Sequence, residues 1–172
     1  MQKQPGSGLG RGMLLVACVI GMVLMTVFFA DLEEQQRNPN RSPQSLRATS
    51  YIEVVLDRSR SGHYVVSGTI NKKPVEFLLD TGATDVVIPI ETAEYLGLSV
   101  GRRSQAMTAN GLITIYATRI SELTIGEIRL TDIRASVNPN MQPQGILLGM
   151  SALKQVEFVQ RGNTLTLRQY DN

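Results

Sequence analysis

Asp80 is the residue of this sequence best placed for acid–base chemistry. The segment Asp80-Thr81-Gly82-Ala83 lies between two apolar runs, Phe77–Leu79 and Val86–Ile88. A carboxylate between two core strands is costly to ionise unless hydrogen bonds or a catalytic role stabilise its charge. The segment therefore indicates either a catalytic carboxylate or an Asp that only organises a turn. Asp-Thr-Gly alone arises by chance in roughly a few per cent of chains of this length.

The remaining side chains offer little alternative chemistry. The 172 residues include one histidine, His63, and one cysteine, Cys18, so a Ser/His/Asp triad would depend on His63 alone. His63 stands in a Ser-Gly-His-Tyr run, which predicts a turn entering a strand rather than a catalytic position. Basic residues are scattered, and aromatic residues are 5% with no Trp, which argues against nucleic-acid binding. We expect neither a metal site nor a cofactor.

Two later segments extend the pattern around Asp80. Ile146-Leu147-Leu148-Gly149 is again an apolar strand that ends in glycine, and the short helical sequence Met150–Lys154 follows it. Between the two apolar strands, Asn110-Gly111 is the strongest hairpin signal in the chain, because a type I′ turn needs positive φ at both central residues. It predicts a hairpin whose first strand ends near Ala109.

Short β-rich runs separated by turn signals fill the sequence from Tyr51 onward. The predicted strands cover residues 51–57, 63–70, 74–80, 112–118, 119–125, 128–137, 156–160 and 164–168. Only two short helices are indicated, Glu91–Leu96 with Gly97 at its C-terminal end and Met150–Lys154. These runs predict a mainly β fold with one or two short helices.

The N-terminal region differs in composition from this β-rich part. Residues 13–30 contain no charged side chain. An α-helix rises ~1.5 Å per residue, so a helix of this length would be nearly long enough to cross a bilayer. Basic residues precede the stretch and acidic residues follow it, so the positive-inside tendency predicts a cytoplasmic segment 1–12 and a single transmembrane anchor at 13–30. A cleaved signal peptide is the alternative, although Phe28 is a poor residue for the position three before a cleavage after Ala30.

Residues 31–50 are rich in Asn, Gln, Ser and Pro and poor in apolar residues. This composition predicts a flexible linker with no core of its own, so the folded domain would begin at residue 51 and end at residue 172. With the N-terminus in the cytoplasm, we expect the folded domain on the outer side of a bacterial inner membrane, in the periplasm.

The segment Val75–Thr84 resembles the catalytic strand and loop of retropepsins, and Ile146–Gly149 is similar to the apolar strand that crosses it in those folds. Over roughly residues 51–167, together with the N-terminal anchor, the chain resembles a bacterial family of membrane-anchored retropepsin-like (clan AA) aspartic proteases. The resemblance implies a single-lobe acid-protease β-barrel preceded by a transmembrane helix. It also implies an aspartic-type endopeptidase with Asp80 as the catalytic residue.

The same resemblance suggests roles for other residues. Thr81, Gly82 and Ala83 would complete the active-site loop, and Leu147-Leu148-Gly149 would form its supporting strand. Ala109-Asn110-Gly111 lies where such proteins carry a flap over the substrate cleft. Asp85 falls where related enzymes contact substrate, and an exposed turn acid is an equally good interpretation of it.

Aspartic proteolysis needs two adjacent carboxylates that share one proton, because like charges at such a distance do not both ionise. The sequence has a single Asp-Thr-Gly, so the second carboxylate must come from another copy in an isologous dimer. The resemblance implies that Thr81 bonds across this dimer and that strands 51–56 and 164–168 supply interface strands. The expected partners are therefore a second copy, a peptide or protein substrate, and the membrane.

Two other functions remain open from the sequence. A β-module of the same fold could bind peptides or proteins in the cell envelope without cutting them. A structural envelope protein could use Asp80 only to cap a turn.

Overall fold

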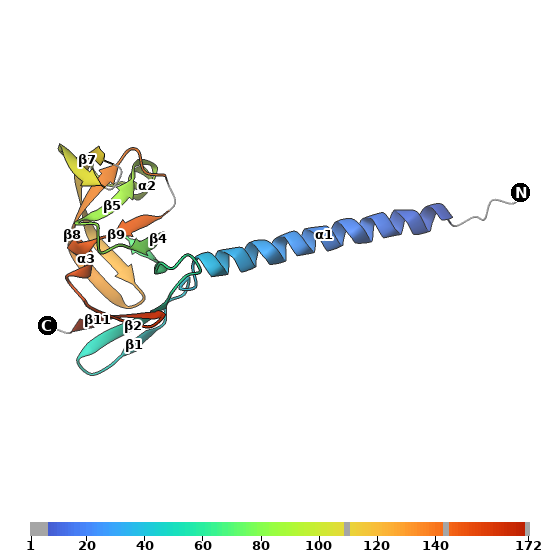
Figure 1. Ribbon diagram of the computed structural model, residues 1–172, viewed down its shortest axis with the longest axis horizontal. Coiled ribbons are helices and arrows are strands. Elements are labelled where there is room, and N and C mark those ends of the chain that lie inside the picture. Colours follow the sequence, from blue (N-terminus) through green and yellow to red (C-terminus); the bar gives the residue numbers. More distant parts are fainter. Residues whose placement is uncertain (1–6, 109–110, 143–144, 171–172) are drawn as a thin grey trace, which may run out of the picture. The chain divides into compact units, whose positions relative to one another are not determined.

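The computed structural model describes residues 7–108, 111–142 and 145–170, with the side chains of residues 7–11 excepted. It has two compact units, one that ends at Gln36 and one that begins at Arg37 and contains the strands, called the β unit from here on. The helices are α1 (Ser7–Arg37), α2 (Ile90–Leu96) and α3 (Met150–Leu153). Figure 1 shows the strands gathered in the β unit, and the fold is mainly β, as predicted.

α1 is apolar on all sides over residues 13–30, and its described side chains there are exposed. By length and composition the helix is able to cross a membrane, and a signal sequence near an N-terminus has the same features. The helix continues beyond residue 30 because Leu, Glu and Gln are good helix formers. It ends at Arg37, since Pro39 disfavours the helical conformation for Asn38.

The segment from Asn38 to Arg47 belongs to the β unit, which differs from the flexible linker predicted for residues 31–50. Asn38 and Asn40 are buried, and β1 (Ser45–Arg47) pairs antiparallel with β2 (Tyr51–Asp57). The prediction counted apolar residues, whereas this segment is fixed by the hydrogen bonds of its amide side chains and backbone. The boundary between the two units therefore lies near Arg37.

Two sheets form the β unit. The smaller one has the strand order β1-β2-β11-β10, all antiparallel, with β10 covering Glu157–Arg161 and β11 covering Thr164–Tyr170. The larger sheet has the order β3-β4-β9-β5-β8-β7-β6. An additional pairing of β3 with β7 closes six of its strands into a barrel, and β6 extends from the barrel as a partner of β7. The strands of the larger sheet are β3 (Val65–Ile70), β4 (Lys73–Leu79), β5 (Val86–Pro89), β6 (Arg103–Thr108), β7 (Gly111–Ile125), β8 (Ile128–Asn138) and β9 (Ile146–Leu148).

β2 and β11 pair with each other along the whole length of β2, and β11 also pairs with β10. The strands expected to pair with a second copy thus pair inside one chain. The turn at Gly162 (φ 58°) signals the β10–β11 hairpin locally, whereas the pairing of β2 with β11 joins segments far apart in the chain and has no local signal. Whether either strand also contacts a second copy stays a prediction.

The core is made of apolar side chains, mainly aliphatic, from both sheets and both short helices. Phe77, Ile88, Ile120, Ile133 and Leu148 are among its fully buried members. These large side chains hold the strands that carry the Asp80 segment and its neighbours, each burial contributing about 1.5–3 kcal/mol relative to exposure. The core therefore fixes the ends of β4, β5 and β9, where the candidate site lies.

Candidate active site

Asp80 directly follows β4, a strand that lies between β3 and β9 in the larger sheet. Its backbone N–H donates to the carbonyl oxygen of Leu148 at 3.2 Å, and the N–H of Leu79 donates to that of Tyr64 at 3.0 Å. The half-buried Asp80 is thus tied to strands on both sides at the point where the chain leaves the sheet. Placing a carboxylate at a strand end leaves its side chain accessible while its backbone stays rigid.

A tight turn follows, which we call the Asp80 loop (Asp80–Asp85). The backbone N–H of Gly82 donates to Oδ1 of Asp80 at 2.9 Å, and the N–H of Ala83 donates to the Asp80 carbonyl at 3.2 Å. Both bonds orient the carboxyl group relative to its own loop, as side chains of Asp commonly do at turns. Thr81 and Gly82 are exposed on the surface of the single chain.

The start of α3 holds the Asp80 loop from below. The N–H groups of Met150 and Ser151 donate to the carbonyl oxygens of Ala83 and Thr84 at 2.8 and 2.9 Å. A Cβ atom on Gly149 would lie 2.1 Å from the carbonyl oxygen of Asp85, a separation that real Cβ atoms do not show. Gly149 is therefore needed because the loop backbone passes directly over it.

The Ser151 hydroxyl makes a second connection that the sequence did not suggest. Ser151 is buried, accepts the N–H of Val86 at 3.0 Å and donates to the carbonyl oxygen of Arg134 at 2.7 Å. One hydroxyl thus joins α3, β5 and β8 beneath the loop. The only hint in the sequence is its place two residues after Gly149.

The supporting strand lies where it was predicted. Leu148 pairs with Leu79 in parallel, and Leu147 pairs with Val87 of β5 in antiparallel orientation. The structure therefore brings Asp80, Thr81, Gly82 and Ala83 together with Leu147, Leu148 and Gly149. Their roles in catalysis and substrate binding stay predictions.

Asp85 is not a free turn acid. Its side chain is 24% exposed, and the Nε of Arg134 donates to its Oδ1 at 2.6 Å. The pair spans the Asp80 loop and β8, so Arg134 is a residue of this region that the sequence did not single out. Whether Asp85 contacts substrate stays a prediction, but any such contact would use a carboxylate already bound to a guanidinium.

The predicted flap corresponds to the hairpin of β6 and β7. Ala109 and Asn110, two of its three predicted tip residues, lie outside the described residues, while Gly111 (φ 99°) begins β7. Met107 and Leu112 face each other across the hairpin and are 77% and 57% exposed. The described end of the hairpin therefore presents apolar side chains to solvent, as a surface that closes over an apolar ligand would.

A cavity of about 390 Å³ opens beside Asp80 and Thr81. Its walls come from both sheets, from α3 and from the loop of residues 58–64, which we call loop 58–64. The apolar lining consists of Leu79, Leu153, Phe158 and Leu165 and the polar lining includes Arg58, His63 and Gln160. Among the residues that the structure describes, no three His, Cys, Asp or Glu side chains are grouped to hold a metal. The cavity can thus hold apolar side chains next to a carboxylate.

The chain matches a known family over most of this site. Residues 66–155 match the family described as "gag-polyprotein putative aspartyl protease", a range that begins in β3 and contains the Asp80 loop, Gly149 and Ser151.

Two curated relatives are similar over a longer range. A Sinorhizobium protein, described as uncharacterized and encoded in the cobV 5′ region, is 30% identical over 173 residues, which cover 95% of this chain and 74% of the relative. An uncharacterized protein of Rickettsia prowazekii is 27% identical over 127 residues, which cover 72% of this chain and 54% of the relative. The chain thus spans about half the length of the second relative.

One solved structure is similar in both sequence and fold. The crystal structure of a retropepsin-like aspartic protease from Rickettsia conorii is 26% identical, with a TM-score of 0.60, and the match covers 72% of this chain and 98% of that chain. This match confirms the predicted retropepsin-like fold class.

Proposed function

This chain belongs to the gag-polyprotein aspartyl protease family, and we propose on that premise that it is an aspartic endopeptidase whose catalytic carboxylate is Asp80. The observation that carries the proposal is the way Asp80 is held. Its backbone is fixed by Leu148, its Oδ1 by the N–H of Gly82, and its loop by the start of α3, next to a cavity with both apolar and polar walls. A turn-capping Asp would also accept the N–H of Gly82, so the support of its loop by α3 beside the cavity is what favours a catalytic role.

The chemistry requires a pair of Asp80 side chains. One ionised carboxylate takes a proton from water, whose oxygen attacks the carbonyl carbon of the peptide bond, while the protonated partner donates its proton to the carbonyl oxygen. Collapse of the tetrahedral intermediate breaks the C–N bond. The carboxyl group that took the proton from water gives it to the leaving nitrogen, and the other carboxylate takes a proton from a hydroxyl of the intermediate, which restores the starting pair. The two carboxyl groups hold one proton between them at the start of the reaction.

The second Asp80 comes from a second copy related by a two-fold axis. Two observations support a contact at this surface. Thr81 and Gly82 are exposed in the single chain although they lie beside the catalytic carboxylate. Both edges of β11 are paired within the chain, which favours a contact around the Asp80 loop over an intersubunit sheet built on that strand.

An inhibitor titration tests the shared site. A peptide in which a hydroxyethylene group replaces the scissile bond mimics the tetrahedral intermediate, and such analogues bind 10²–10⁸-fold tighter than substrates. We expect calorimetry to give one inhibitor bound per two chains of the full-length protein in detergent. One inhibitor per chain would contradict the shared site. If the inhibitor does not bind and a diverse peptide library is left uncut from acid to neutral pH, the chain is a binding module instead.

α1 anchors the β unit in a bacterial inner membrane as a single span, with the β unit in the periplasm. The length and apolar surface of the helix, the basic residues before it and the acidic residues after it support this arrangement. We expect the chain to stay with the membrane after alkaline washing. We also expect protease added to spheroplasts to digest the β unit. A shorter, soluble periplasmic chain that begins near residue 31 would indicate a cleaved signal peptide instead.

A further inference from the structure

A buried amide side chain joins the two sheets next to the candidate site. Asn40 is 6% exposed, and its Nδ2 donates to the carbonyl oxygens of Asp57 at 2.9 Å and Val65 at 2.7 Å. Its Oδ1 accepts the N–H of Asp57 at 2.7 Å. Because Asp57 ends β2 of the smaller sheet and Val65 begins β3 of the larger one, a single side chain fixes the spacing of the two sheets at this point.

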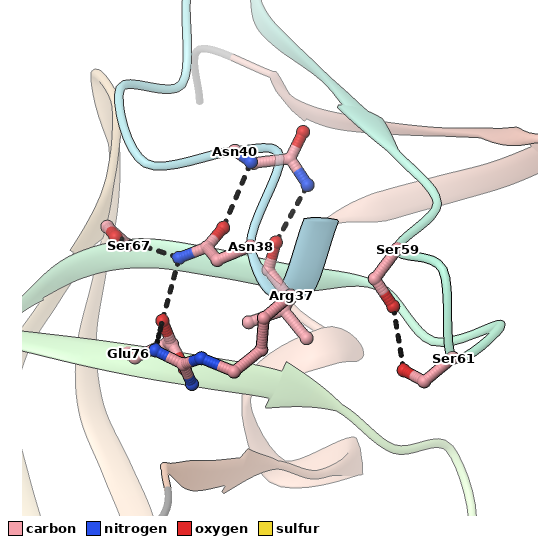
Figure 2. A network of polar contacts seen from close by, with 8 residues as sticks. Arg37, Asn38, Asn40, Ser59, Ser61, Ser67 and Glu76 are labelled. Atoms are coloured by element: carbon pink, nitrogen blue, oxygen red, sulfur yellow. Dashed lines mark hydrogen bonds and ion pairs between the residues drawn. The ribbon is translucent and has the colours of Figure 1, made fainter. Parts of the chain in front are cut away.

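The backbone of Asn40 strengthens this connection. Asn40 forms a parallel bridge with Val66, and its carbonyl oxygen accepts the N–H of Ser67 at 3.1 Å. All donors and acceptors of the Asn40 side chain and its carbonyl are thus engaged by strand backbone, as expected for a buried polar group. The residue sits in the segment that follows α1, where Figure 2 shows it beside Asn38.

Asp57 and Val65 are also the two flanks of loop 58–64. This loop has internal hydrogen bonds. The N–H of Ser59 donates to the carbonyl oxygen of His63, and the N–H of Gly62 donates to that of Ser59. The hydroxyls of Ser59 and Ser61 lie 2.9 Å apart (Figure 2). A loop that is internally bonded moves as one body, so its position is set by its two flanks and by the N–H of Arg58, which donates to the carbonyl oxygen of Asn163 at 2.9 Å. Asn40 holds both flanks.

Loop 58–64 is in turn a wall of the cavity beside Asp80. Arg58, Gly62, His63 and Tyr64 line the cavity together with Asp80 and Thr81. The carbonyl oxygen of Tyr64 accepts the N–H of Leu79, the residue before Asp80. A displaced loop would therefore shift both the cavity wall and the backbone that carries the carboxylate.

We propose that Asn40 is a positioning residue for the active site, which acts through loop 58–64 and the bond between Tyr64 and Leu79. The expected effect of Asn40 on catalysis rests on the proposed peptidase function. Its expected effect on the position of loop 58–64 rests on the geometry alone. Nothing in the family match covers it, since that match begins at residue 66.

Asn38 provides a matched control. It is 1% exposed, lies two residues away and also makes three side-chain hydrogen bonds: to the hydroxyl of Ser67 at 3.1 Å, to Oε2 of Glu76 at 2.9 Å, and from the N–H of Asn40 at 2.9 Å (Figure 2). Its partners beyond Asn40 lie within β3 and β4, away from the flanks of loop 58–64. Asn38→Ala should therefore destabilise the β unit to a similar degree as Asn40→Ala without releasing the loop.

The experiment compares the two variants in the full-length chain, at a temperature at which both are folded by circular dichroism. We expect Asn40→Ala to lower kcat for a cleavable peptide by about 10- to 100-fold with KM nearly unchanged, because misplacing the site by ~1 Å costs this much. Asn38→Ala should keep kcat within about two-fold, because the geometry around Asp80 should stay intact in this variant.

Hydrogen exchange supplies a readout that needs no catalytic activity. In Asn40→Ala the amides of Ser59, Gly62 and Leu79 should exchange faster, whereas in Asn38→Ala they should keep the wild-type rate. The proposal is overturned if the two variants show the same exchange at these amides, or if Asn40→Ala keeps the kcat of Asn38→Ala. A wild-type chain that cuts no peptide would refute the proposed function, and the exchange rates alone would then decide the role of Asn40.

Discussion

Asp80→Asn should lower kcat/KM for peptide cleavage by at least about 1,000-fold, because the proposed symmetric dimer would lose both its general base and its general acid at once. The substitution keeps the shape of the side chain, and an amide Oδ1 still accepts the N–H of Gly82. We therefore expect the midpoint of thermal unfolding to stay within a few degrees of the wild type. Cleavage kinetics and circular dichroism on the same preparation measure the two effects.

Asp132→Asn is the matched control for this prediction. Asp132 is an exposed carboxylate paired with Arg119 and distant in sequence from the Asp80 loop, so its loss should leave cleavage unchanged. Mixing wild-type and Asp80→Asn chains in equal amounts should leave about half of the activity that the wild-type chains have before mixing, because with free subunit exchange only about a quarter of all dimers are wild-type homodimers. Undiminished cleavage by Asp80→Asn itself would rule out Asp80 as the catalytic residue.

The candidate site was predictable from sequence to the extent that its signals are local. Asp80 and Gly149 each follow an apolar strand, and that pattern located both sides of the site before the fold was known. Ser151 and Arg134 were missed because their importance comes from partners far along the chain, Val86 and Asp85. No local pattern marks a buried hydroxyl that joins three elements.

In the fold, too, the local features could be predicted from the sequence and the long-range ones could not. β-branched runs and turn residues predicted most strands, although β7 continues unbroken through the predicted boundary at 118–119 because β8 pairs with it on both sides of that point. Hydropathy could not predict that residues 38–47 belong to the β unit, since Asn38 and Asn40 are buried through hydrogen bonds rather than apolar area. It also could not predict that β11 pairs with β2, which lies far from it in the sequence.

Gly149→Ala should destabilise the β unit by at least about 3 kcal/mol, at the upper end of the cost of overpacking. The new Cβ would stand 2.1 Å from the carbonyl oxygen of Asp85 and 2.6 Å from that of Ala83. Both are backbone atoms, so relief requires the Asp80 loop to move away from α3. That movement would break the bonds from Met150 and Ser151 that hold the loop. Denaturant unfolding of the full-length chain measures the loss.

A second glycine-to-alanine substitution shows whether the loss of stability comes from this clash or from replacing a glycine in general. Gly21 has no atom within 4 Å of an added Cβ, so Gly21→Ala should leave the unfolding free energy of the β unit unchanged. Any folded Gly149→Ala protein should also cleave peptides at least about 100-fold more slowly, because a displaced loop misplaces Asp80 relative to its partner. A stable and fully active Gly149→Ala variant would mean that the loop does not rest on this glycine. The packing of α3 against the Asp80 loop would then not be what fixes the catalytic carboxylate.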